Sequence, residues 1–465
     1  MNEFESETPS DLPSTWKFWQ KRRYVVVLMA IIGFSKLSEL NVDIVAMTEN
    51  RIVHYDNGTV VHERYFDWSS KEQELIVSSF FYGYILTSLL GGYLGAKLGG
   101  SLVFGLGIFA ASVLTLLAPI AAHAGLYTLV AVRLMQGMCQ GVALPSIQDV
   151  WSRWSPPQER SRISTMSYAG TYVGTVIAVS FSRIMASNFV WESTFYVLGG
   201  IACVWCICWL IIVKRDPEQD RRISKEELKY IQSSLGLLQR SGSSTIPWKD
   251  IFTSKIVLAI CVAQTAAMWG THTVITVLPT FLRDVFMFDL GKAGLVAAAP
   301  HLTMGILLLV SGHCADHFQI KGYLTTTQVR RYFNCLGFIL QAIFLLLAAF
   351  SQQSFWSVIY ITLSVGFGGM AFCGFYVNVL DIAPNYASVI FGITNTLGTL
   401  PRIVSPILTE YLVKSKTAAE WRLVFYVAAG IYGIGTLVYW FWCSGELQPW
   451  AKNSTVNSTG VSKDN

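Results

Sequence analysis

The feature that most constrains this chain is a series of apolar stretches, each about as long as a helix that crosses a lipid bilayer. Such a helix needs about 20 apolar residues to span roughly 30 Å of hydrocarbon. Twelve stretches meet this length, and they begin near Tyr24, Gln73, Leu102, Leu126, Ile163, Ser193, Lys255, Leu290, Val329, Trp356, Tyr386 and Trp421. The sequence therefore predicts an all-α membrane protein with twelve transmembrane helices.

The composition favours a bundle in lipid over a set of soluble domains. Of the 465 residues, 52% are hydrophobic and 14% are charged, whereas a typical globular protein has about 25% charged residues. Backbone groups in hydrocarbon must be satisfied within their own segment, so the apolar stretches are expected to be helical. The formal net charge of +5 is small and scattered, which argues against a nucleic-acid partner. The chain begins with about twenty mostly polar residues, including Glu3, Glu5, Glu7 and Asp11. A cleavable signal peptide does not look like this, so the first apolar run is expected to be a retained span.

Basic residues gather in four regions: before the first span, around 153–162, within 214–250, and at Arg330 and Arg331. With twelve crossings these regions share one side, which the positive-inside rule assigns to the cytoplasm together with both termini. The expected organisation is a tail over 1–23, a six-helix bundle over 24–213, a linker with a short helix over 214–254, a second six-helix bundle over 255–443, and a tail over 444–465. Asn57 heads an Asn-Gly-Thr sequon on the opposite side and is predicted to be glycosylated.

A run of glycine followed by charged residues occurs at the matching place in each half, which suggests that the two halves are copies of one unit. Span two ends in a glycine-rich run that contains Lys97, and span eight ends in a run from Gly312 to Asp316 and His317. Two such halves can rock about a central site, which is how alternating access works. We expect Lys97 and Asp316 to act in gating. A cytoplasmic ion network that latches one conformation is predicted to contain Glu159, Arg160 and Arg162.

Two arginines within the spans are the main candidates for a solute site, because a charge at mid-span costs about 2.5–3.5 kcal/mol on insertion scales. Arg133 lies about two turns into span four, and Gln140 follows seven residues later on the same face. Arg133 either holds a carboxylate or phosphate or is a structural clamp on a carbonyl or a glutamate. Arg402 follows Pro401, whose ring frees a carbonyl one turn earlier. Its guanidinium either binds that carbonyl or faces the cavity.

Further polar candidates lie in other spans. Lys36, Glu39 and Asp43 share one face of span one by their spacing. Lys36 and Glu39 can neutralise each other, which leaves Asp43 as an acid able to take up a coupling proton; alternatively, Glu39 and Asp43 bind a cationic solute. The remaining candidates for solute binding are Tyr82, Trp269, His272 and Asn378. Asn378 and Asp381 are interpreted first as a structural polar pair at a helix hinge and only second as ligands.

Several strings of residues resemble a known family. The glycine-rich turn after span two is similar to the signature of the major facilitator superfamily. Longer strings resemble solute carrier family 17, which includes sialin, vesicular glutamate transporters and sodium–phosphate cotransporters. These strings are Phe66–Trp68, Ser79–Ile85, Gly91–Leu94, Trp151–Pro157, Glu159–Arg162, Leu380–Ala387, Gly392–Thr396, Gly445–Glu446 and Gln448–Trp450.

The resemblance covers nearly the whole chain and implies transport of organic or inorganic anions, driven by a proton or sodium gradient or by membrane potential. Arg133 matches an arginine of the family. The family arginine of span one corresponds to Leu37, and the family glutamate of span four corresponds to Gln140. Arg402 stands where relatives carry glycine, so it is a candidate to replace the span-one arginine from across the cavity.

The sequence therefore predicts a secondary active transporter of small anions that works by alternating access as a monomer in the lipid bilayer. Two alternatives stay open: a carrier of a cationic or zwitterionic solute that uses the acids of span one, and a solute sensor that does not transport. We find no nucleotide-binding loop, nucleophile elbow or metal triad, so neither an enzyme nor a cofactor or metal is expected. The membrane is expected to be the plasma membrane or that of an endolysosomal or other vesicle.

Overall fold

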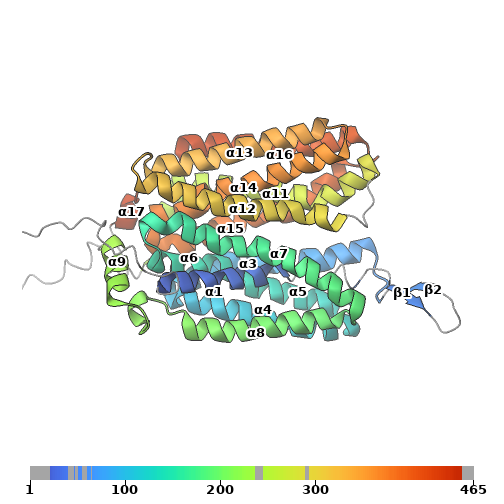
Figure 1. The fold of residues 1–465 in the computed structure, drawn as a ribbon, viewed down its shortest axis with the longest axis horizontal. Coiled ribbons are helices and arrows are strands. Elements are labelled where there is room, and N and C mark those ends of the chain that lie inside the picture. Colours follow the sequence, from blue (N-terminus) through green and yellow to red (C-terminus); the bar gives the residue numbers. More distant parts are fainter. Residues whose placement is uncertain are drawn as a thin grey trace, which may run out of the picture.

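The computed structural model describes residues 21–39, 47, 51–54, 60–63, 65–235, 245–287 and 293–452, which form a bundle of long helices (Figure 1). The first half consists of α1 (Arg22–Glu39), α3 (Ser70–Leu98), α4 (Gly100–Ala124), α5 (Leu126–Gly141) continued by α6 (Ala143–Trp154), α7 (Arg160–Asn188) and α8 (Glu192–Ile212). The second half consists of α11 (Lys255–Phe286), α12 (Ala293–Ile320), α13 (Thr326–Phe350), α14 (Ser354–Ile382), α15 (Ala387–Leu412) and α16 (Ala418–Trp442). The predicted twelve-helix architecture is confirmed.

Short elements connect these helices or follow them. They are β1 (Arg51–His54), β2 (Val60–Glu63), η3 (Pro157–Glu159), η4 (Pro217–Gln219), α9 (Lys225–Leu235), α10 (Trp248–Thr253), η7 (Pro384–Tyr386) and α17 (Pro449–Lys452). The antiparallel hairpin β1–β2 lies at one end of the bundle, and α9 and α17 lie at the other (Figure 1). We call these the hairpin end and the linker end.

Eight helices within the described residues are long and apolar enough to span a membrane by length and composition alone. The helices that do not meet this criterion include α5 and α6, which divide one crossing at Gly141 and Val142, and α15, which carries Arg402 and two internal prolines. Polar groups in these segments lie between helices rather than in lipid. Arg133 and Gln148, for example, are 3% and 0% exposed.

Side-chain caps fix where several helices begin. Ser69 with Glu72, Thr325 with Gln328, and Thr417 with Glu420 form capping boxes at α3, α13 and α16, each satisfying two of the free backbone N–H groups of a first turn. The predicted linker helix is α9, and Ser224 Oγ accepts a hydrogen bond from the Glu227 backbone N–H at 3.1 Å.

The linker helix α9 is attached to the first transmembrane helix by charged groups. The Glu227 carboxylate accepts hydrogen bonds from the backbone N–H groups of Arg22 and Arg23 at 2.7 and 3.2 Å. Asp220 pairs with the side chain of Arg22. A carboxylate at the N-terminus of a helix satisfies unpaired N–H groups and interacts favourably with the helix dipole, so the linker stabilises the start of α1.

The two halves meet chiefly along two helix pairs, α3 with α15 and α7 with α12. Glycine permits this approach where α3 crosses α15 near the linker end. A Cβ at Gly92 would collide with the carbonyl oxygen of Ser388, and one at Gly392 would lie 3.0 Å from the carbonyl oxygen of Ser88. The halves are therefore in backbone-to-backbone contact at this crossing.

We expect Gly92→Ala to lower the melting temperature of the purified protein, because the added methyl group meets backbone and overpacking costs typically 1–3 kcal/mol. Gly430→Ala in α16 is the matched control, since a Cβ there meets nothing within 4 Å. Alanine is a better helix former than glycine by about 1 kcal/mol, so the control should melt at or above the wild-type temperature. Equal effects of the two changes, measured by thermal unfolding in one detergent, would contradict the close crossing.

Candidate solute-binding site and gate

Arg402 is a cation held between the two halves. Its guanidinium lies over the ring of Phe81 in α3, with 5.4 Å from Cζ to the ring centroid. Nη2 lies 3.8 Å from the sulfur of Met268 in α11, which is a weak acceptor. Nε is buried and has no hydrogen-bond partner, and no carboxylate of the described residues pairs with this guanidinium. A partly buried charge without a counter-charge is costly, so this arrangement can hold an anion.

Side chains with polar tips surround Arg402 from both halves. Four side chains lie close enough to interact electrostatically with its charge. They are three tyrosines of the first half and one histidine of the second: Tyr84, Tyr168, Tyr172 and His272. The ring of Tyr172 lies 6.2 Å from that of His301 in α12. Tyr168 also faces Phe372 and Tyr376 of α14, at 4.8 and 5.1 Å between ring centroids. Phenol and imidazole groups can donate hydrogen bonds to a bound anion.

Arg133 lies at the same level of the bundle as Arg402. Its guanidinium covers Phe80 at 5.4 Å, and Phe80 is the immediate neighbour of Phe81, which Arg402 covers. Arg133 Nη1 donates to Gln136 Oε1 at 3.2 Å, and Gln136 Nε2 donates to the Thr115 hydroxyl at 3.2 Å. The structure thus brings the two predicted arginines to consecutive rings of α3, and part of Arg133 is engaged in a network within its own half. Gln140, on the same face of α5, is 3% exposed.

Asn395 of α15 ties the two halves together beside this site. Its amide nitrogen donates to the Tyr84 hydroxyl at 3.0 Å and to the Ser88 hydroxyl at 2.9 Å, both in α3. Its amide oxygen accepts from Gln264 Nε2 in α11 at 3.1 Å, and Gln264 Oε1 accepts from the Thr394 hydroxyl at 2.7 Å. All of these groups are buried. The network orients Tyr84 next to Arg402 and would break if α3 and α15 moved apart.

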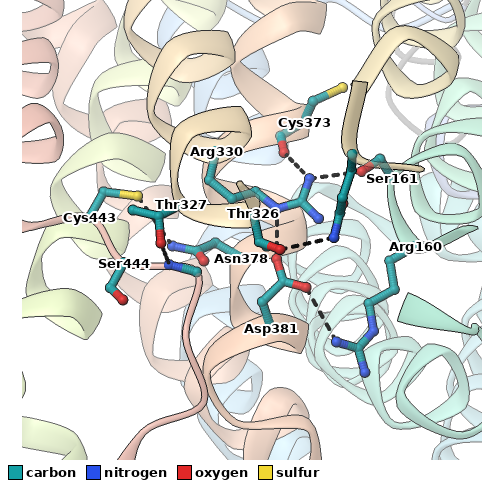
Figure 2. Close-up of polar contacts among 12 residues, drawn as sticks. Arg160, Ser161, Thr326, Thr327, Arg330, Cys373, Asn378, Asp381, Cys443 and Ser444 are labelled. Atoms are coloured by element: carbon teal, nitrogen blue, oxygen red, sulfur yellow. Dashed lines mark hydrogen bonds and ion pairs between the residues drawn. The ribbon is translucent and has the colours of Figure 1, made fainter. Parts of the chain in front are cut away.

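The linker end is closed by a buried ion network around Asp381, at the end of α14 (Figure 2). Asp381 Oδ1 accepts from Arg160 Nη1 of α7 at 3.3 Å, and Oδ2 accepts from Arg330 Nε of α13 at 2.6 Å. Arg330 Nη1 also donates to the Ser161 hydroxyl at 2.8 Å and to the carbonyl of Cys373 at 2.9 Å. Arg160 and Ser161 belong to the first half and the other three residues to the second, so this network joins the halves.

A second contact across the halves involves Asp316, near the end of α12. Its carboxylate accepts from the backbone N–H groups of Ser161 and Arg162 at 3.0 and 2.9 Å. These N–H groups belong to the first turn of α7 and have no partner within that helix. Asp316 therefore caps a helix of the opposite half, which supports the gating role predicted for it.

Glu159 extends the closed network to the linker. Its carboxylate accepts from Arg23 Nε at 2.8 Å and pairs with Arg162, and Arg23 Nη1 pairs with Glu227 of α9 at 2.9 Å. Burial by itself raises the pKa of Glu159, but the pairs with Arg23 and Arg162 outweigh it and lower that pKa below its usual value. Since the folded-state pKa of Glu159 is lowered, the ionised carboxylate stabilises the folded protein fully at pH values above its pKa in the unfolded state. This stabilisation is lost as the pH falls through the folded-state pKa.

Tyr82 and Lys97 lie away from the roles expected of them. Tyr82 is 44% exposed and shares an outer stripe of α3 with Leu86, Leu90 and Lys97, so it faces away from Arg402. Lys97 lies over the ring of Tyr93 on this same stripe, apart from the ion pairs that close the linker end. The helical period explains both placements, because positions 82, 86, 90, 93 and 97 recur on one face.

Asn378 also lies outside the solute site. Its amide nitrogen donates to the Tyr439 hydroxyl at 3.1 Å and contacts the sulfur of Cys443, beside the Asp381 network in Figure 2. This placement fits the interpretation of Asn378 and Asp381 as polar residues at a helix end. Asp381 has a further role that the interpretation did not include, because it joins helices of both halves through an ion network.

The other predicted residues lie outside the described part of the chain or against its core. Asp43 and Asn57 lie outside the described residues. Lys36 and Glu39 belong to the last turns of α1, but their side chains are not among those described. Trp269 packs against the core from a partly exposed face of α11, which it shares with Val262 and Thr265 and which is rotated away from Gln264 and Met268.

Several residues of the site were not singled out from the sequence, namely Tyr84, Ser88, Tyr168, Tyr172, Gln264, His301, Arg330 and Asn395. Tyr84 and Asn395 fall within strings that carried the family resemblance, and a polar side chain in an apolar helix is itself a functional signal. What the sequence does not reveal is which of the many such residues meet. Within the described residues, no group of three or more His, Cys, Asp or Glu side chains could hold a metal ion.

Comparison with known proteins agrees with this architecture. A sequence model of the Major Facilitator Superfamily matches residues 44–406. The chain is 38% identical over 443 residues to vesicular glutamate transporter 1 of Xenopus tropicalis, covering 94% of this chain and 77% of that protein. It is 38% identical over 442 residues to vesicular glutamate transporter 2 of Homo sapiens, covering 93% and 76%.

Among solved structures, the E. coli fucose:proton symporter superposes with a TM-score of 0.62, covering 91% of this chain and 98% of the symporter. The sequence identity of 12% means that this likeness concerns the fold alone. The chain belongs to the major facilitator superfamily and, within it, to solute carrier family 17 with the vesicular glutamate transporters, and it is a membrane transporter rather than an enzyme.

Proposed function

We propose that this chain transports a small organic anion by alternating access and that Arg402 holds the solute between the two halves. The observation that supports this most is the partly buried guanidinium of Arg402, whose Nε lacks a partner and which contacts Phe81 of the opposite half. A carboxylate would supply the missing acceptor and counter-charge. Relatives 38% identical to the chain are named as glutamate transporters, and glutamate carries such carboxylates.

The surroundings of Arg402 suggest how the anion is oriented. Tyr84 is fixed by Asn395 at 3.0 Å, and Tyr172 faces His301. One carboxylate oxygen would accept from Arg402 and the other from a tyrosine hydroxyl or from His272. Because these donors come from both halves, solute binding and the relative position of the halves are coupled.

The transport cycle requires the linker end to open. In the closed arrangement, Asp381 and Asp316 join the halves through Arg160, Ser161 and Arg162. We propose that these contacts break when the solute is released at the linker end, and that Asn395 parts from α3 in the same movement. An anion would enter from the hairpin end while the network is intact.

The positive-inside rule supports assigning the linker end to the cytoplasm, together with both termini. Alternating access would then carry the anion between the cytoplasm and the space outside the cell or inside a vesicle. A coupled proton or sodium ion is part of the proposal, with His272 and the acids of span one, Glu39 and Asp43, as candidates for its site. Asp43→Asn should abolish pH-dependent accumulation if Asp43 carries the proton.

A transport assay with purified protein in proteoliposomes tests the function. Labelled glutamate, a monocarboxylate, phosphate and an organic amine are compared, each with and without a pH gradient or membrane potential. Saturable uptake of an anion supports the proposal. Uptake of the amine alone would favour a cation carrier, and solute-induced thermal stabilisation without flux would favour a sensor.

The proposed orientation makes a prediction for the sequons. Asn57, between the first two spans, should carry a glycan when the protein is expressed in a eukaryotic cell, whereas Asn453 and Asn457 should not, because glycosylation occurs on the non-cytoplasmic side. Asn57→Gln is expected to remove the glycosidase-sensitive mobility shift on a gel. A shift that persists in Asn57→Gln and disappears in Asn453→Gln with Asn457→Gln would reverse the orientation.

A further inference from the structure

A separate cavity, open to the surface, lies in the second half, at the hairpin end between α11, α15 and α16. Its volume is about 240 Å³. An engineered cavity of about 150 Å³ binds benzene, so this cavity has room for one small organic group. The lining residues are Thr280, Asp284, Pro406, Thr409, Glu410 and Val413, with Lys416 and Trp421 completing the wall.

The helical period explains why polar groups meet here. Thr280 and Asp284 are four residues apart at the end of α11, and Thr409 and Glu410 follow Pro406 by three and four residues in α15, so each set shares one face. Pro406 lacks a backbone N–H and its ring disturbs the preceding turn. α15 nevertheless continues through Pro406 to Leu412 and packs along α11.

Asp284 is the group that points to a ligand. Its side chain is only 5% exposed, and Oδ1 pairs with Arg283 at 3.2 Å. Oδ2 is buried and has no hydrogen-bond partner, although it belongs to a residue that lines the cavity. A buried carboxylate oxygen without a donor is costly, and a cation or N–H donor inside the cavity would satisfy it.

The other walls favour an organic ammonium ion over a bare metal ion. Glu410 adds a second carboxylate, and Trp421, which is 2% exposed and held edge-on by Phe281 at 5.7 Å, adds an indole. Indole is the best aromatic partner for a cation, and quaternary ammonium groups are recognised in this way. A metal ion would need several oxygen ligands at 2.0–2.6 Å, and an indole is not one of them.

We propose that this cavity, lined by Asp284, Glu410 and Trp421, binds a small organic ammonium group, either a free amine or the headgroup of a choline or ethanolamine lipid. Lys416 lies at the cavity wall with a left-handed backbone (φ 57°), and its like charge weakens binding of the cation. Every lining residue belongs to the second half, so the site shares no residue with the anion site at Arg402.

Binding of tetramethylammonium to the full-length protein tests the proposal, measured by calorimetry in nanodiscs of phosphatidylglycerol, a lipid without an ammonium group. Asp284→Asn and Glu410→Gln should each raise the Kd at least tenfold, and Lys416→Gln should lower it several-fold. Glu410 is exposed, so its variant is expected to fold even if Asp284→Asn does not. Glu74→Gln removes an exposed acid of the hairpin end outside the cavity and should leave the Kd unchanged.

Nanodiscs of phosphatidylcholine distinguish the two sources of the ammonium group. If phosphatidylcholine competes with tetramethylammonium and raises its Kd, the site is assigned to a lipid headgroup. If the Kd is the same in both kinds of nanodisc, the site is assigned to a free amine. The proposal is overturned if tetramethylammonium shows no binding beyond that of sodium at equal ionic strength, or if the four variants share one Kd. Neither result would bear on anion uptake.

Discussion

Replacing Arg402 with glutamine is expected to abolish saturable anion uptake at solute concentrations near the wild-type KM. The glutamine keeps much of the length of the side chain but loses the charge and the paired donors. Truncating one partner of a buried, hydrogen-bonded charge pair costs about 2–5 kcal/mol, which is at least about a 30-fold rise in Kd. Equilibrium binding and proteoliposome uptake of the same labelled anion measure this directly.

Arg402→Lys separates charge from geometry. Lysine keeps the positive charge but lacks the planar fork that pairs with a carboxylate, so its Kd should lie between those of wild type and Arg402→Gln. Arg221→Gln, at an exposed position of the linker, is the control for loss of one positive charge. An unchanged KM in Arg402→Gln, with Arg221→Gln also unchanged, would remove Arg402 from the solute site.

The gate makes the second large prediction. Asp381→Asn leaves the guanidinium groups of Arg160 and Arg330 without the carboxylate that pairs with both of them. Water cannot replace it at Arg330, because that side chain is 0% exposed. Breaking a buried ion pair by removing one partner costs about 3–5 kcal/mol. Because Arg160 and Arg330 come from opposite halves, much of this cost is relieved when the linker end opens. The variant should therefore favour the arrangement that is open at the linker end.

Cys373 reports on this opening. It is 0% exposed, and its carbonyl accepts from Arg330. In a variant whose other eight cysteines are replaced by alanine, Asp381→Asn should speed modification of Cys373 by a water-soluble thiol reagent at least tenfold. Adding Arg160→Gln removes one unpaired charge and should reverse part of this increase.

Asp250→Asn, an exposed position of the linker end, controls for the loss of one negative charge. The gate would be refuted by equal labelling rates of Cys373 in wild type and Asp381→Asn when both proteins elute as monodisperse species. A variant that is too unstable to purify still permits the measurement in intact membranes, where the rate is compared at equal protein abundance.

The order of the helices could be predicted from the sequence because hydrocarbon imposes its own length and polarity. The predicted starts at Leu126 and Lys255 coincide with the observed ones, and that at Tyr24 is two residues late. Polar residues between apolar runs mark where a helix leaves the membrane, and the capping motif at Ser224 marks α9. Each of these features depends on neighbours in the chain.

The members of the solute site and gate could be predicted only in part. Arg133 and Arg402 stood out because each is a charge in an apolar helix, and both lie against consecutive rings of α3. Tyr82 was misplaced because a span boundary does not reveal which face of the helix looks inward. Ion pairs such as Arg160 with Asp381, 221 residues apart, cannot be deduced from spacing at all.

The sequence by itself therefore determined that the chain crosses a membrane twelve times, where most of those helices begin, and which charged residues had to be sheltered from lipid. Only the tertiary structure decided which of those charges pair. Asp381 pairs with Arg160 and Arg330, and Asp316 caps the first turn of α7, whereas Arg402 pairs with no carboxylate among the described residues. The physical reason is that burial in hydrocarbon is a property of a segment of chain. The pairing of charges instead depends on how helices from opposite halves rotate and pack against one another.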